Sequence, residues 1–231
     1  MKYNISEIFH SIQGEGPHIG HPVIFLRLSG CNLRCKWGET LCDTPYTSWN
    51  PEQNLLLTEE ILTQLEITAP TCKHIVITGG EPTIQPDFKE LCVALKANGY
   101  NLDLETNGTG LIPDEIDTIV CSPKLSDSIP TGTSFAEIHE KRRTKLHPTI
   151  QGNDTRLNLK FVISPRTDIQ EVKNILQQLN SPAERTYLMP EGITSEVIRK
   201  NSPVVAEMAL KNGFNFSTRL HILLWGNKRG V

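Results

Sequence analysis

The sequence lacks any apolar run that approaches the roughly 20 residues needed for a membrane-spanning helix. Its first nine residues are mixed polar and contain no apolar core of the kind that a secretory signal peptide carries. We therefore expect a cytoplasmic protein with no membrane partner. A reducing cytosol would also keep unpaired cysteines as free thiols.

Basic charge is also scarce, because the formal net charge of the 231 residues is -3. The longest basic run is the triplet 141–143, which is more typical of a solvated loop than of a nucleic-acid surface. We therefore expect no nucleic-acid partner. The sequence also lacks repeats and a convincing linker, so the length fits a single domain over residues 1–231.

The sequence lacks a second CxxC or HxxxH pair, which matters because three cysteines crowd into twelve residues at 31–42. An odd number of close thiols favours a metallocluster with one open metal site over a disulfide. Structural zinc is the alternative, but it normally takes four protein ligands. The fourth ligand would have to be one of three histidines, His10, His18 or His21.

Short β-rich runs alternate with helical patterns along the chain, which predicts a mostly parallel sheet with crossover helices. The predicted strands outnumber the predicted helices, so we expect an α/β fold of the open, partial TIM-barrel type. The predicted strands are 23–28, 74–78, 102–106, 117–121, 157–163, 185–189 and a last strand region at 214–224. The predicted helices are 58–67, 86–98, 169–179, 194–212 with a break at Pro203, and a short one at 134–143 within an otherwise irregular interval.

Polar or glycine-rich segments follow each predicted strand at its carboxyl end. The cysteine segment follows the first strand, and Gly-Gly-Glu-Pro at 79–82 follows the second. Similar segments begin at Glu105, Ser122 and Pro190. Because the ligand site of a parallel α/β sheet lies at the carboxyl ends of its strands, we expect these segments to share one ligand. Gly79 and Gly80 would let the backbone approach it closely.

These motifs, taken together, resemble the radical S-adenosylmethionine superfamily. More narrowly, the segments 11–16 (Ser-Ile-Gln-Gly-Glu-Gly), 25–35 and 42–44 resemble the 7-carboxy-7-deazaguanine synthases of queuosine and 7-deazapurine biosynthesis. The resemblance runs over nearly the entire chain, and its motifs occur in the order found in that family.

The resemblance implies a [4Fe-4S] cluster held by Cys31, Cys35 and Cys42, with S-adenosylmethionine chelating the fourth iron. It further implies a lyase-type reaction, in which a 5'-deoxyadenosyl radical abstracts hydrogen from 6-carboxy-5,6,7,8-tetrahydropterin. The ring then contracts with loss of ammonia to give 7-carboxy-7-deazaguanine. Mg²⁺ near the substrate carboxylate would be bound through Thr44. A homodimer and a flavodoxin or ferredoxin electron donor are implied as well.

The family's site residues can be placed on matching positions of this sequence. Those implied to hold S-adenosylmethionine are Trp37, Gly38, Glu39, Gly80, Glu105, Ser122, Pro123, Lys124, Met189, Pro190, Glu191 and Gly192. Those implied to hold the substrate are Ile12, Gln13, Gly14, Glu15, Arg27, Thr78 and His221. Arg27 suits this role physically, because a planar guanidinium can grip a carboxylate through two parallel hydrogen bonds.

One departure from the family pattern stands out. Six residues separate Cys35 from Cys42, whereas the superfamily usually has two at this place. A turn at Gly38 would bring Cys42 back, and Thr40 and Leu41 would then take the place of residues 37–39. Two alternative functions remain open from the sequence: a radical S-adenosylmethionine activase that generates a glycyl radical on a partner, and a zinc-stabilised interaction module.

Overall fold

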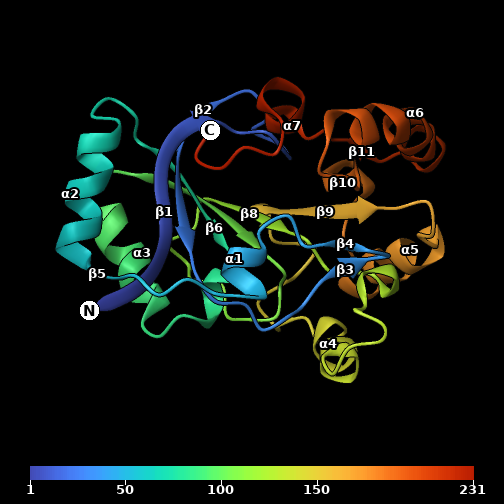
Figure 1. Cartoon of the computed structure of the whole chain (residues 1–231), viewed down its shortest axis with the longest axis horizontal. Helices are drawn as coiled ribbons and strands as arrows, with labels where there is room; N and C mark the ends of the chain where they lie inside the picture. The colour runs from blue at the N-terminus through green and yellow to red at the C-terminus, as the bar shows by residue number, and fades with distance from the viewer.

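A curved nine-stranded sheet organises the computed structural model, which describes all 231 residues (Figure 1). Its strand order is β11-β10-β9-β8-β7-β6-β2-β1-β5. The strands are β1 Lys2–Ile12, β2 Pro22–Leu28, β5 Leu55–Leu57, β6 His74–Gly79, β7 Asn101–Thr106, β8 Thr118–Cys121, β9 Leu157–Ile163, β10 Thr186–Pro190 and β11 Asn215–Phe216. A separate two-stranded hairpin consists of β3 Lys36–Trp37 and β4 Thr40–Leu41.

The sheet is mostly parallel and does not close. Every neighbouring pair from β2 to β11 is parallel, whereas β1 pairs antiparallel with both β2 and β5. No ladder joins β5 to β11, so the two edges stay apart. The prediction of an open, partial barrel is confirmed.

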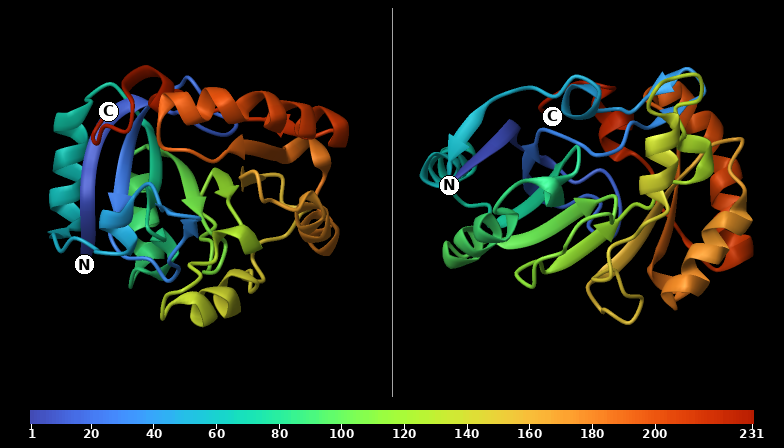
Figure 2. Two further views of the ribbon diagram at one scale, coloured as in Figure 1. Left: turned by 45° about the vertical axis from the view of Figure 1, so that its right-hand side comes forward. Right: turned by 90° about the horizontal axis from the view of Figure 1, so that it is seen from below.

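The longer helices lie along the outside of this curved sheet, and shorter ones lie at its rim (Figure 2). They are α1 Pro45–Ser48, α2 Thr58–Thr68, α3 Phe88–Ala97, α4 Ala136–Arg143, α5 Ile169–Leu179, α6 Ser195–Asn212 and α7 Leu220–Trp225, with 3₁₀ turns at Pro82–Ile84, Ser126–Ser128 and Ala183–Arg185. The Asp168 carboxylate accepts a 2.9 Å bond from the Gln170 N–H and so caps α5 as expected. None of the helices is both long enough and apolar enough to traverse a membrane.

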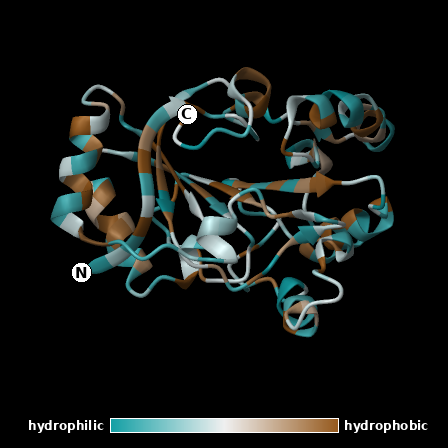
Figure 3. Ribbon diagram, in the orientation of Figure 1, coloured by the Kyte–Doolittle hydropathy of each residue, from teal (hydrophilic) through white to brown (hydrophobic).

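The main core lies between the sheet and these helices. Because strand side chains alternate between faces, Ile75 and Ile77 of β6 join a cluster of 32 buried residues, while Val76 and Thr78 face the barrel interior. On α3, Leu91 and Leu95 supply the matching apolar stripe. Figure 3 shows the apolar residues gathered along the central strands, with α4 at the rim mostly hydrophilic. The barrel interior is therefore free to carry polar side chains.

Three local predictions were wrong. The N-terminal strand β1 was not anticipated, and α6 continues through Pro203 without a break. Only Asn215–Phe216 of the last expected strand pairs with the sheet, and Leu220–Trp225 is helical. A short apolar run fits a strand and a buried helix equally well, so its packing environment decides.

Candidate active site

The barrel opens onto a cavity of about 410 Å³ at the carboxyl ends of its strands. Thr78 of β6, Glu105 of β7 and Met189 of β10 line it from the sheet. Residues 227–231 also line it, as does the segment that carries the cysteines. The expectation that the strand-end segments share one site is therefore met by the fold.

The six residues between Cys35 and Cys42 form the β3–β4 hairpin. Trp37 pairs with Thr40, and Gly38 turns the chain with a φ of +60°, a value that favours glycine. The Cys42 N–H then donates a 3.1 Å hydrogen bond to the Cys35 carbonyl. All three cysteines consequently line the cavity despite the longer gap.

The thiols of Cys31, Cys35 and Cys42 suit a multinuclear cluster better than a single ion. A zinc ion with Zn–S bonds of about 2.3 Å would hold its sulfur atoms about 3.8 Å apart. The three sulfur atoms do not all lie within 4.8 Å of one another. Burial raises the pKa of the Cys31 thiol to about 12 and raises the pKa values of the other two thiols, so a metal must displace protons to bind thiolates.

Gly79 and Gly80 bring the end of β6 against the cysteine segment. A Cβ at Gly79 would overlap the Leu28 carbonyl, and one at Gly80 would overlap Gly30 and lie 2.7 Å from the Cys31 Cβ. Glu81, which is fully buried, fixes this turn by accepting bonds from Thr106 Oγ1 (2.7 Å) and the Asn107 N–H (2.6 Å). The two glycines therefore let the end of β6 pack directly against the backbone beside Cys31, where a side chain of any size would clash.

Most residues implied to bind S-adenosylmethionine line the cavity. They are Trp37, Gly80, Glu105, Ser122, Lys124, Met189, Glu191 and Gly192. Thr40 and Leu41 line it too, whereas Gly38 and Glu39 form the hairpin tip, and the Glu39 side chain is 99% exposed. Pro123 and Pro190 lie beside lining residues without lining the cavity themselves.

The residues implied to bind substrate come from β1, the loop after it, β2, β6 and α7. Those that line the cavity are Ile12, Gln13, Glu15, Arg27, Thr78 and His221. Gly14 lies behind them, where a Cβ would overlap the His221 ring, and its carbonyl accepts a 2.9 Å bond from the Leu220 N–H. Gly14 thus lets α7 pack against the loop after β1. Glu105 bridges this group, since Thr78 Oγ1 (3.0 Å) and Gln13 Nε2 (3.3 Å) both donate to it.

Arg27 lies largely buried in β2 and has a carboxylate partner. Its Nε donates to Glu7 Oε1 at 2.6 Å, and the Tyr46 hydroxyl donates to the same oxygen at 3.0 Å. Burial acts against the charge, but Tyr46 and Glu7 raise the pKa of Arg27, so it stays cationic. Its two Nη groups make no hydrogen bond within the chain and are available to a ligand in the cavity.

Two buried cationic residues of the cavity escaped the sequence analysis. Lys160 Nζ lies 2.5 Å from Glu15 Oε2 and 3.4 Å from Glu105 Oε1. Arg219 Nε lies 2.9 Å from Glu15 Oε1, and the same guanidinium pairs with Asp43. Lys160 lies between the apolar residues Leu159 and Phe161 of β9, and a charge in such a run is costly to bury without a partner, which could have drawn notice to it. Arg219 precedes α7, where a strand was expected.

Thr44 also lines the cavity, next to the cysteines. Its hydroxyl lies 3.6 Å from Cys42 Sγ, and its carbonyl accepts a 3.0 Å bond from the Thr47 N–H at the start of α1. The neighbouring Asp43 carboxylate is engaged by Arg219. The Thr44 hydroxyl therefore remains a candidate oxygen ligand.

Known proteins of one family are similar to this chain over nearly its whole length. The family model of the radical SAM superfamily matches residues 26–181. The 7-carboxy-7-deazaguanine synthase of Halobacterium salinarum is 35% identical over 237 residues, covering 96% of this chain and 90% of the relative. That of Rhodopirellula baltica is 37% identical over 232 residues, covering 98% and 88%. Among solved structures, QueE from Escherichia coli matches with a TM-score of 0.69 at 25% identity, covering 96% of this chain and 95% of that one.

Proposed function

The chain belongs to the radical S-adenosylmethionine superfamily and, within it, to the 7-carboxy-7-deazaguanine synthases, and from this we propose that the cavity lined by Cys31 and Arg27 is its active site. The protein is a radical S-adenosylmethionine enzyme of the queuosine pathway, which converts 6-carboxy-5,6,7,8-tetrahydropterin to 7-carboxy-7-deazaguanine with loss of ammonia. The resemblance drawn from the motifs is thereby confirmed.

One observation carries the assignment of the site. The three cysteines and the Arg27 guanidinium line the same cavity, although they come from different segments. Cys31, Cys35 and Cys42 would hold the [4Fe-4S] cluster, which with S-adenosylmethionine supplies the one-electron chemistry that starts the reaction. Gly80, which lines the cavity and packs against Cys31, would present its backbone to the amino acid part of S-adenosylmethionine.

A second group of residues that line the cavity would orient the pterin. The free Nη groups of Arg27 would bind its carboxylate, and Gln13 and Thr78 are held in place by their shared partner Glu105. We add Lys160 to this set, because its ammonium lies between Glu15 and Glu105 on the cavity wall. Burial of these groups excludes bulk water, so their charges act on a bound substrate with little screening.

Further parts of the proposal rest on the family alone. They are Mg²⁺ bound through Thr44, a homodimer, a flavodoxin or ferredoxin as electron donor, a cytoplasmic location and one radical S-adenosylmethionine domain over residues 1–231. Magnesium prefers oxygen ligands and keeps several waters, which a single threonine hydroxyl beside a substrate carboxylate would allow.

The decisive experiment incubates the reduced, cluster-reconstituted protein with S-adenosylmethionine and 6-carboxytetrahydropterin. Mass spectrometry should detect the deazapurine product, and the Cys31→Ala variant should form none. S-adenosylmethionine cleavage without any deazapurine would contradict the proposal and favour the glycyl-radical activase. Zinc uptake with no iron uptake would instead favour the interaction module.

A further inference from the structure

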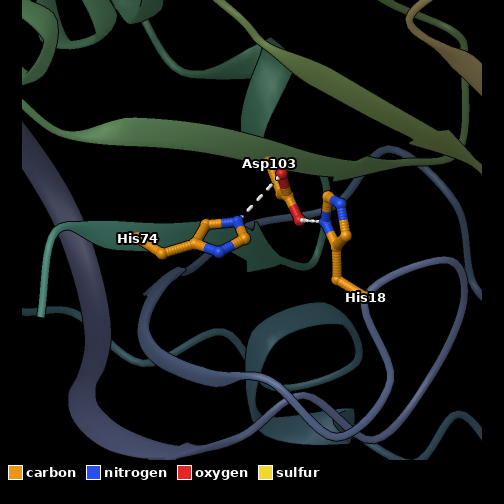
Figure 4. Close-up of side chains that lie close together, drawn as sticks. All are labelled: His18, His74 and Asp103. Atoms are coloured by element: carbon orange, nitrogen blue, oxygen red, sulfur yellow. Dashed lines mark hydrogen bonds and ion pairs between the residues drawn. The ribbon is translucent and has the colours of Figure 1, made fainter.

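A second polar cluster lies in the barrel outside the active-site cavity and consists of His18, His74 and Asp103 (Figure 4). His18 Nδ1 lies 2.6 Å from Asp103 Oδ2, and His74 Nε2 lies 3.1 Å from Asp103 Oδ1. The two imidazoles therefore converge on one carboxylate from different sides. The Asp103 side chain is only 3% exposed.

The cluster lies at the amino ends of the strands, opposite the active site. His74 begins β6, and four residues later Thr78 of the same strand lines the cavity. Asp103 of β7 precedes the cavity residue Glu105 by two positions. Because side chains of a strand alternate, each of these pairs shares the inward face of the barrel. None of the three cluster residues lines the cavity.

A third histidine stands next to the cluster. The His21 ring stacks on that of His18 with centroids 5.2 Å apart, and its centroid lies 6.5 Å from that of His74. Three of the seven histidines in the chain thus gather around one buried aspartate. His18 and His21 are separated by two residues in the loop between β1 and β2, so one short segment supplies both.

We propose that His18, His74 and Asp103 bind a divalent transition-metal ion of the Zn²⁺ type. Two imidazole nitrogens and a carboxylate oxygen are a ligand set that such ions favour. All three ligand atoms lie within 4.8 Å of one another, and tetrahedral ligands about 2.1 Å from zinc are about 3.4 Å apart. A small outward shift of the rings would admit the ion, with His21 or water as the fourth ligand.

The position of the site gives the ion a structural consequence. His18 belongs to the loop 13–21, whose other end contributes Gln13 and Glu15 to the active site. This loop is closed by backbone bonds of 2.8 Å from the Gln13 N–H to the His21 carbonyl and from the Gly20 N–H to the Gln13 carbonyl. A metal that fixes His18 to β6 and β7 would therefore hold the whole loop against the sheet.

The test measures zinc and iron in the same samples of cluster-reconstituted protein, after equilibration with Zn²⁺ and removal of the excess. We expect one zinc per chain in addition to the cluster iron. X-ray absorption at the zinc edge should show nitrogen and oxygen ligands at about 2.0 Å and no sulfur ligand at about 2.3 Å. His18→Gln and His74→Gln should each lower zinc at least tenfold and leave iron unchanged. His10→Gln, at an exposed histidine of β1, is the matched control and should keep its zinc.

Two results would overturn the metal site. One is a protein that binds no zinc although its iron content is complete. His18, His74 and Asp103 would then be joined by hydrogen bonds alone. The other is zinc bound elsewhere in the protein. Either sulfur ligands around the zinc or zinc that persists in both His18→Gln and His74→Gln would show this. Because His18 is partly exposed in a loop, its variant should fold even if a change at buried Asp103 does not. Neither result bears on the synthase activity, which is measured separately.

Discussion

The Cys42 N–H donates a hydrogen bond of 3.1 Å to the Cys35 carbonyl, and this bond closes the β3–β4 hairpin. The six-residue gap between these cysteines is therefore a folded insertion rather than a loose loop. The hairpin returns the chain to the place it left, so Cys42 lines the same cavity as Cys31. The longer gap is compatible with the family's three-cysteine site for this reason.

We predict that Cys42→Ala abolishes both iron uptake and S-adenosylmethionine cleavage, because it removes one of three cluster ligands. Cys72→Ala is the matched control, since Cys72 is free and lies outside the cavity. Iron analysis and detection of 5'-deoxyadenosine provide the measurements. A Cys42→Ala protein with a full cluster would show that Cys42 is not a ligand.

Arg27→Ala should raise the KM for the pterin about 10- to 100-fold, as expected when a charge-assisted pair worth about 1.5–3 kcal/mol is lost. Binding of S-adenosylmethionine should be unchanged, because the proposed arrangement assigns Arg27 to the substrate carboxylate alone. The KM of Arg27→Lys should lie between those of the parent protein and Arg27→Ala, since lysine keeps the charge but lacks the planar guanidinium that can form two parallel hydrogen bonds. Steady-state kinetics with the pterin varied would check this. An unchanged KM in Arg27→Ala would remove its proposed role.

Lys160→Met should lower the free energy of unfolding of the apoprotein by about 3 kcal/mol, because it leaves buried Glu15 with one cationic partner fewer. Lys160 and Arg219 together hold the pKa of Glu15 well below its usual range in spite of burial. The double variant Lys160→Met with Glu15→Gln should recover part of the loss. Urea unfolding of the two single variants and the double variant measures the coupling, and strictly additive effects would contradict it.

The stability of the apoprotein should fall as the pH drops from about 6.5 towards 4, owing in part to His139. Burial, with Arg143 and Lys124, lowers the pKa of His139 to about 4 from 6.5. Its Nδ1 accepts the Arg34 N–H at 3.1 Å, so the neutral ring is the one that fits. The unfolded chain binds more protons in this window, which favours unfolding by about 1–2 kcal/mol at pH 5.

His139→Asn keeps an acceptor for the Arg34 N–H but cannot titrate, so its unfolding free energy should depend less on pH between 7 and 5. The quantity compared is the slope of the unfolding free energy against pH, which does not depend on the absolute stability of the variant. His10→Asn, at an exposed position of β1, serves as control and should keep the slope of the parent protein. An identical slope in all three proteins would exclude His139 as the cause.

Local sequence patterns were sufficient for the parallel strands of the sheet. The runs that became β2, β6 and β9 are short, rich in β-branched residues and bounded by turn residues, so they indicate buried strands without tertiary information. The polar segments after them also predicted the site, because the carboxyl ends of parallel strands meet at one edge. The same reasoning failed at Leu220–Trp225, whose short apolar run became α7.

The sequence by itself determined most of the parallel strands and the longer helices, and it indicated that three close cysteines bind a soft metal, because helix and strand periods, turn residues and thiol chemistry act over a few neighbouring residues. Only the tertiary structure decided which distant charges meet. Glu15 forms ion pairs with Lys160 and Arg219, and Arg27 forms one with Glu7. Strand pairing and chain packing bring these residues together, and no local pattern specifies them. The convergence of His18 and His74 on Asp103 has the same origin, since three separate segments must fold before the three side chains can touch.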